Sequence, residues 1–114
     1  MATAAEIRNK ASLKLGIGAL GQTLESAVSK DLDDAYTEVY ARLRDEDLVS
    51  WAFTSEVPDE LVDPVVDLVA FARSYMVSGE RYQRIGVAAS QAESRIRRSL
   101  QDDYFTDESE AKYY

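Results

Sequence analysis

Apolar side chains in this chain recur at three- and four-residue spacing, which is the period of one face of an α-helix. The clearest run forms a narrow stripe that comprises Leu32, Ala35, Tyr36, Val39 and Leu43. A later run has the spacing of a helix that packs lengthwise on another helix, with Tyr82, Ile85, Ala89, Ala92, Ile96 and Ser99 or Leu100 on the packing side. No stretch alternates apolar and polar residues as a strand does. The sequence therefore predicts an all-α fold, a four-helix up-and-down bundle with an extended C-terminal arm.

Capping residues place the first two helices. Thr3 and Glu6 have the spacing of a capping box, so a helix should follow them and end at Gly16. Its buried side should hold Ile7, Ala11 and either Leu13 or Leu15. Ser26 or Ser29 is expected to cap the second helix. Within that helix Glu38 precedes Arg42 by four residues, a spacing that favours an ion pair.

A third helix is expected after the breaks at Pro58 and Pro64, with Asp63 as its cap and Pro64 at its first position. Its buried face would hold Val65, Leu68, Val69, Ala72, Tyr75 and Met76, and Val66, Ala70 and Phe71 would occupy the other side. A helix that is apolar almost all round is either central to its fold or covered by another copy of the chain. Trp51 and Phe53, just before it, are expected in the core. In the final helix, Gly86 indicates a close backbone approach.

The last segment, residues 101–114, differs in character from the rest of the chain. Its five carboxylates against one lysine give a net charge of −4, half of the −8 of the whole chain. It also carries four aromatic residues, Tyr104, Phe105, Tyr113 and Tyr114. We interpret residues 1–100 as a helical domain and residues 101–114 as a flexible acidic-aromatic arm.

Composition excludes several classes of function. A chain of 114 residues with 46% hydrophobic and 30% charged residues is typical of one globular domain. It has no cysteine and no histidine, so disulfides, thiolate metal sites and the usual general base are excluded. The net charge of −8 argues against a surface that follows nucleic-acid phosphates. Without a long apolar run or the apolar core of a signal peptide, the chain is expected to be soluble and cytoplasmic.

Two motifs suggest chemistry that their context does not support. Gly16, Gly18 and Gly21 form a G-x-G-x-x-G, but a helix rather than a strand precedes them, so a packed turn is expected instead of a dinucleotide site. Asp31, Asp34 and Glu38 share one helix face; a cation site is the alternative and a solvated face the preferred interpretation. We expect no catalytic residue, metal or cofactor.

The order of features resembles the head-to-tail adaptor (connector, tail accessory or head completion) proteins of tailed bacteriophages. The likeness rests on Leu13-Lys-Leu15-Gly16, Gly21-Gln-Thr, Asp34-Ala35-Tyr36 followed by Val39-Tyr40, Arg44-Asp-Glu-Asp-Leu48, Trp51-Ala-Phe53, Pro58, Pro64 and Leu68-Val-Ala70. It implies a non-enzymatic virion protein that forms a dodecameric ring under the portal protein. Such a ring extends the DNA channel, so that viral DNA passes through it as cargo, and it presents a docking surface to tail or nozzle proteins. The resemblance implies no membrane contact, host cytoplasm during assembly, and the head-tail junction of the virion afterwards.

Partner-binding residues follow partly from this resemblance. It makes the arm a docking segment, with Tyr104, Phe105, Tyr113 and Tyr114 as anchors on the portal or a neighbouring subunit. From charge alone, candidates for contacts between subunits are Arg95, Arg97 and Arg98 on the basic final helix, which also carries Arg81 and Arg84, and Asp34 and Glu38 on the second helix. A solvated basic face is the competing interpretation. The alternative function is a small cytosolic regulatory module whose acidic arm binds a basic partner protein.

Overall fold

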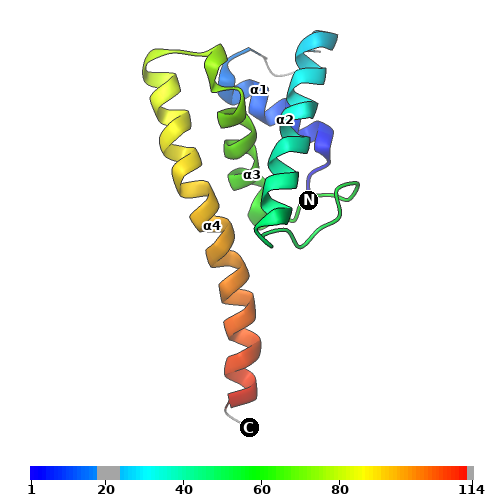
Figure 1. The fold of residues 1–114 in the computed structure, drawn as a ribbon, viewed down its shortest axis with the longest axis vertical. Helices are drawn as coiled ribbons and strands as arrows, with labels where there is room; N and C mark the ends of the chain where they lie inside the picture. The colour runs from blue at the N-terminus through cyan, green and yellow to red at the C-terminus, as the bar shows by residue number, and fades with distance from the viewer. Residues whose placement is uncertain (18–23, 113–114) are drawn as a thin grey trace.

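The described residues of the chain fold into four α-helices (Figure 1). The computed structural model describes residues 1–17 and 24–112, and the side chains of residues 1–17 and 24–100. The elements are α1 (Ala4–Leu15), α2 (Ser26–Asp45), α3 (Asp59–Ala72), a 3₁₀ turn η1 (Ser74–Met76) and α4 (Gly79–Lys112). The described residues contain no β-strand, only an isolated bridge in which Ala2 and Val57 exchange backbone hydrogen bonds of 3.1 and 2.8 Å. The prediction of an all-α, four-helix fold is confirmed.

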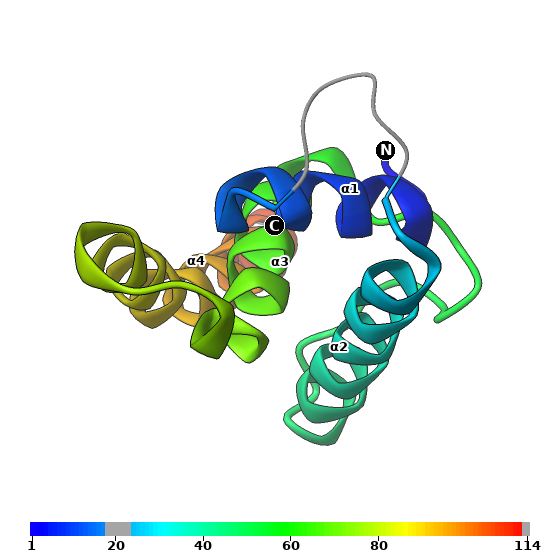
Figure 2. The same cartoon turned by 90° about the horizontal axis from the view of Figure 1, so that it is seen from above.

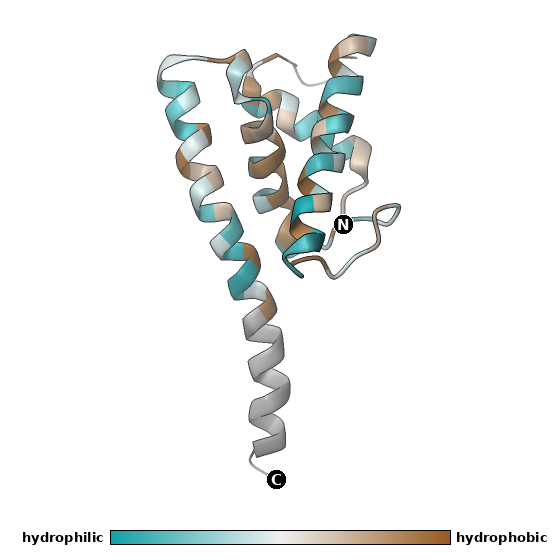
Figure 3. Cartoon of the chain, in the orientation of Figure 1, coloured by the Kyte–Doolittle hydropathy of each residue, from teal (hydrophilic) through white to brown (hydrophobic). Residues whose placement is uncertain are grey.

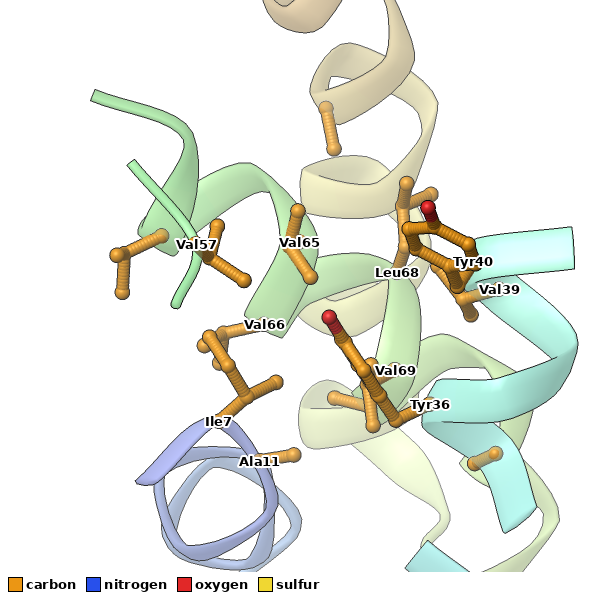
Figure 4. Packing of buried hydrophobic residues seen from close by; sticks show 14 of the residues in the cluster. Ile7, Ala11, Tyr36, Val39, Tyr40, Val57, Val65, Val66, Leu68 and Val69 are labelled. Carbon is orange, nitrogen blue, oxygen red and sulfur yellow. The ribbon is translucent and has the colours of Figure 1, made fainter. Parts of the chain in front are cut away.

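Helix α3 lies at the centre of the bundle and contacts the other three helices. Helices α2, α3 and α4 alternate in direction, and α1 lies across α3 and α2 (Figures 1 and 2). Apolar residues cover α3 along its length (Figure 3). Figure 4 shows Ile7 and Ala11 of α1 on one side of α3, near Val66, and Val39 of α2 beside Leu68. Of the two explanations for an all-round apolar helix, a central position in the fold is the one observed.

Local signals at both ends of α1 act as predicted. The Thr3 hydroxyl accepts a hydrogen bond of 3.2 Å from the backbone N–H of Glu6. Gly16 ends the helix in the left-handed region at φ 75°, and its N–H donates to the carbonyl of Leu13. Leu15 is buried whereas Leu13 is partly exposed, which decides between the two.

Helix α2 buries its whole predicted stripe, but its predicted cap is wrong. Leu32, Ala35, Tyr36, Val39 and Leu43 are all buried. The helix begins directly at Ser26 after Glu25, and no side chain caps it. In the first turn Val28 packs, half-buried, against the core, and such packing is the usual source of helix stability in a folded domain.

Helix α3 begins earlier than predicted, because its start is decided by burial. It starts at Asp59, so that Pro64 lies inside the helix and Asp63 does not cap it. A proline there removes one helical hydrogen bond, at a cost of about 3 kcal/mol. The extra turn buries Leu61 and Val62, and each of these side chains returns roughly 2 kcal/mol. Two buried apolar side chains therefore outweigh the lost bond.

At its C-terminal side the buried face of α3 ends sooner than the sequence predicted. The helix stops at Ala72, and the tighter 3₁₀ turn that follows changes the angular phase of the chain. Tyr75 is consequently 72% exposed instead of buried, and Phe71 is also largely exposed. At this end α4 lies farther from α3 than it does lower in the bundle (Figure 1). Tyr82, predicted on the packing side of α4, is therefore exposed.

The aromatic segment between α2 and α3 is non-helical and anchors to α2. Trp51 is buried; its Nε1 donates to the hydroxyl of Tyr36 at 3.2 Å, and its carbonyl accepts from the hydroxyl of Tyr40 at 2.9 Å. Phe53 stacks on Tyr36 with ring centroids 5.8 Å apart but remains 43% exposed. Core packing is thus confirmed for Trp51, whereas Phe53 only covers the edge of the cluster.

Helix α4 is the longest element and continues past the body of the molecule. Its 34 residues correspond to about 51 Å of helix, against about 21 Å for α3. The backbone of residues 101–112 is helical, where the sequence predicted an irregular arm; the division into a 1–100 domain and a 101–114 arm stays a prediction. A Cβ on Gly86 would meet open space, so the predicted close backbone contact there is wrong.

Candidate assembly surfaces of helix α4

A pocket opens where the first turns of α4 diverge from α3. We call it the head pocket; its volume is about 380 Å³ and its lining residues are Lys14, Asp67, Ala70, Arg81, Arg84, Ile85 and Ala88. One wall of the pocket is the side chain of Arg81, and it occupies space that Gly16, left-handed at the end of α1, leaves open. A Cβ there would lie 1.3 Å from Nη1 of Arg81, so this guanidinium packs directly on the end of α1. The negative end of a helix dipole favours a cation in that position.

The electrostatics of the head pocket centre on one buried carboxylate. Asp67 is only 4% exposed; it forms an ion pair with Lys14, and its Oδ2 lies 3.9 Å from Nη1 of Arg95. Arg81 and Arg84 add two exposed cations to the lining. Three cations against one carboxylate leave the pocket lining with an excess of positive charge in a chain whose net charge is −8. This lining can hold an anionic group, and the described part of it contains no nucleophile paired with a base.

Sequence reasoning missed Lys14 and Asp67. A signal was present, because Asp67 is the only charged residue within the apolar run from Val65 to Ala70. A charged side chain in the buried face of a helix needs a partner from another element. The identity of that partner depends on how α1 crosses α3, which no local pattern encodes.

The three arginines predicted at subunit contacts lie farther along α4 and have different surroundings. Arg95 faces Asp67 as described, and Arg97 Nη2 lies 3.4 Å from Oε2 of Glu46, the residue directly after α2. Arg98 is exposed and, with Arg95, lines a shallow depression that also includes Ser90, Gln91 and Ser94. Some of the basic side chains of α4 therefore already pair with acidic side chains of the same chain. The roles of Arg95, Arg97 and Arg98 between subunits stay predictions.

The acidic residues of α2 are likewise partly engaged inside the chain. Arg73, at the end of α3, donates to Oδ1 of Asp31 and to Oε2 of Glu38, both at 2.9 Å. The predicted helical pair of Glu38 with Arg42 is not formed; Arg42 lies 3.9 Å from Glu93 instead. Asp34 is exposed, and its predicted role between subunits is untested. Asp31 and Glu38 thus hold a guanidinium between them through charge-assisted hydrogen bonds, which are stronger than bonds between neutral groups.

Between α2 and α4 two carboxylates share a site. A hydrogen bond with Glu93 raises the pKa of Glu46, and Arg97 and Arg42 oppose this rise. Because the pKa is raised in the folded state, this pair favours folding at low pH and loses that contribution as the pH rises through the pKa of Glu46. We predict that Glu93→Gln lowers the pKa of Glu46 toward its usual value, measured by NMR titration of the carboxyl carbons. An unchanged Glu46 titration would mean that the two carboxyls do not interact in solution.

The remaining sequence-predicted residues lie at the chain end and in the glycine motif. Tyr104 and Phe105 belong to the helical backbone of α4, and Tyr113 and Tyr114 lie outside the described residues. Of the G-x-G-x-x-G, Gly16 ends α1, whereas Gly18 and Gly21 lie outside the described residues. The motif follows a helix, as expected, and not the strand that a dinucleotide fingerprint requires.

Comparison with known proteins gave no relative: no protein-family profile, no curated protein and no solved structure matches the chain. Within residues 1–17 and 24–112, no helix is both long and apolar enough to cross a membrane. Among residues 1–17 and 24–100, whose side chains the structure describes, no group of three or more acidic side chains is placed to hold a metal ion.

Proposed function

We propose that this protein is a structural adaptor that assembles with copies of itself and docks on a larger protein ring through the projecting end of α4. The head-to-tail adaptor of a tailed phage, bound beneath the portal, is the specific form that the sequence resemblance supports. The ring extends the DNA channel and offers its outer end to tail proteins.

The observation that supports this proposal is the length of α4 relative to the body. Of the side chains that the structure describes, Leu100 is the last on α4 to pack against the core, and the helix continues to Lys112. The molecule measures 56 Å along its longest axis but only 30 and 26 Å across (Figure 1). A helix that leaves its own bundle presents a face that a partner can cover.

The charges agree with a channel-forming ring. The chain carries a net charge of −8, so its surface has few free cations to retain DNA phosphates during passage. Two arginines of α4, Arg81 and Arg84, lie at the head pocket, where a protein contact can use them. A ring also needs two different complementary faces on each subunit, and the two ends of α4 differ in charge.

Electron microscopy tests the proposal directly. The purified protein is mixed with the portal protein encoded in the same genome, and an added ring of density beneath the portal is expected. Truncation after Leu100 should abolish this ring, because it removes the projecting helix, while the circular dichroism of the body remains helical. Portal particles that never gain density with the full chain would overturn the adaptor function.

The alternative is a regulatory module that binds a basic protein through the acidic segment, whose net charge is −4. The same truncation distinguishes the two functions. A regulator would lose binding to one soluble basic protein and would never add density to a portal ring.

A further inference from the structure

We propose that the head pocket receives the segment Asp102-Asp103-Tyr104-Phe105 from the α4 of a second copy of this chain. The inference rests on the proposed function, because it names the contact by which neighbouring copies of the adaptor would join. It follows from the chemistry of the pocket, the composition of the segment and the geometry of α4.

The head pocket selects for a ligand that is both anionic and apolar. Its lining combines the cations of Lys14, Arg81 and Arg84 with the apolar side chains of Ala70, Ile85 and Ala88. The carboxylate of Asp67 is already paired with Lys14, which leaves the two arginines as the exposed cations of the lining. A guanidinium binds a carboxylate with two parallel hydrogen bonds, and its plane also stacks on aromatic rings.

The chain contains one segment with this combination at its projecting end. On the helical backbone of this segment Asp102 and Phe105 are three residues apart and share one face, so a carboxylate and an aromatic ring lie side by side there. The carboxylates of α2 are less suited to the role, because Asp31 and Glu38 already bind Arg73. A carboxylate and an aromatic ring on one helix face match a pocket lined by both cations and apolar side chains.

The segment cannot reach the pocket of its own chain. Arg84 and Asp102 lie on one continuous helix, so about 27 Å of helix axis separates them. The head pocket is at the end of the bundle where α4 begins, and α4 carries its last residues away from that end (Figure 1). The occupant must therefore come from another copy. The donor and acceptor surfaces differ, which is the kind of contact that a closed ring requires.

Disulfide trapping tests this contact cleanly because the chain has no cysteine of its own. One variant carries Ala88→Cys in the pocket lining and a second carries Thr106→Cys beside the docking segment. The two full-length variants are mixed at about 0.1 mM and oxidised. Docking holds the sulfurs at an effective concentration in the millimolar range, so the crosslinked heterodimer should form about tenfold faster than by random collision.

Two controls define the result. Thr37→Cys, on the exposed side of α2, replaces Ala88→Cys and gives the rate of random collision. Adding Arg81→Glu and Arg84→Glu to the pocket variant should return the crosslinking rate to that level, whereas the matched reversal of two exposed cations elsewhere, Lys30→Glu and Arg44→Glu, should not. Crosslinking no faster than with Thr37→Cys would overturn the inference.

The outcome separates this inference from the adaptor function. If an added ring appears on the portal but the specific crosslink does not form, the head-pocket contact is wrong and the adaptor function stands. If the crosslink forms but no portal ring gains density, the contact between copies stands and the adaptor function is wrong.

Discussion

Replacing Ile96 with alanine is expected to lower the free energy of unfolding by about 3 kcal/mol, because it opens a cavity where α4 packs on the core. Ile96 is 0% exposed and is the last fully buried residue of α4 among those whose side chains the structure describes. For a domain of this size the loss corresponds to a fall in Tm of roughly 15 °C. Thermal unfolding followed by circular dichroism measures it.

A matched control on the same helix isolates the effect of burial. Val87 is 58% exposed, so Val87→Ala should leave the Tm nearly unchanged. Ile96 is also positioned to affect function, since it fixes α4 to the body just before the helix projects. If Ile96→Ala unfolds at the same temperature as Val87→Ala, the packing of α4 against α3 in the structure is not that of the protein in solution.

The elements that were predictable from the sequence are those fixed by neighbouring residues. The cap at Thr3, the stop at Gly16 and the buried stripe from Leu32 to Leu43 each depend on contacts within a few positions. The start of α3 could not be predicted in this way. Asp63 and Pro64 form a better local signal for a helix start than Asp59 does. The helix nevertheless begins at Asp59, because this start buries Leu61 and Val62.

The candidate surfaces were harder to predict because they combine residues that are distant in sequence. Glu38 has a suitable partner four residues away in Arg42, yet it binds Arg73 at the end of α3. The helix period predicts which residues share a face, but not which face of another helix lies opposite. The head pocket exists only because α4 diverges from α3 near Arg81. The turn η1, which joins α3 to α4 at this point, has no periodic signature in the sequence.

The pair of Lys14 and Asp67 should show the second large effect, and it should be asymmetric. Lys14→Met is expected to cost about 3 kcal/mol, because the carboxylate of Asp67 stays buried and keeps only Arg95, at 3.9 Å. Lys14→Met combined with Asp67→Leu should recover most of this loss, because no buried charge remains without a partner and the leucine can extend into the head pocket. Unfolding in urea at pH 7 measures both variants.

The difference in stability between the single and the double variant shows whether the ion pair stabilises the fold or only sets α1 against α3. If the double variant is as stable as the natural chain, the ion pair contributes little net free energy, and its role is to set the end of α1 against α3. Disulfide trapping of the double variant would then slow if α1 loses its position, because Arg81 packs on Gly16 two residues after Lys14. A single variant Lys14→Met as stable as the natural chain would instead show that Arg95 alone compensates Asp67, and the ion pair of Asp67 with Arg95 would be the important one.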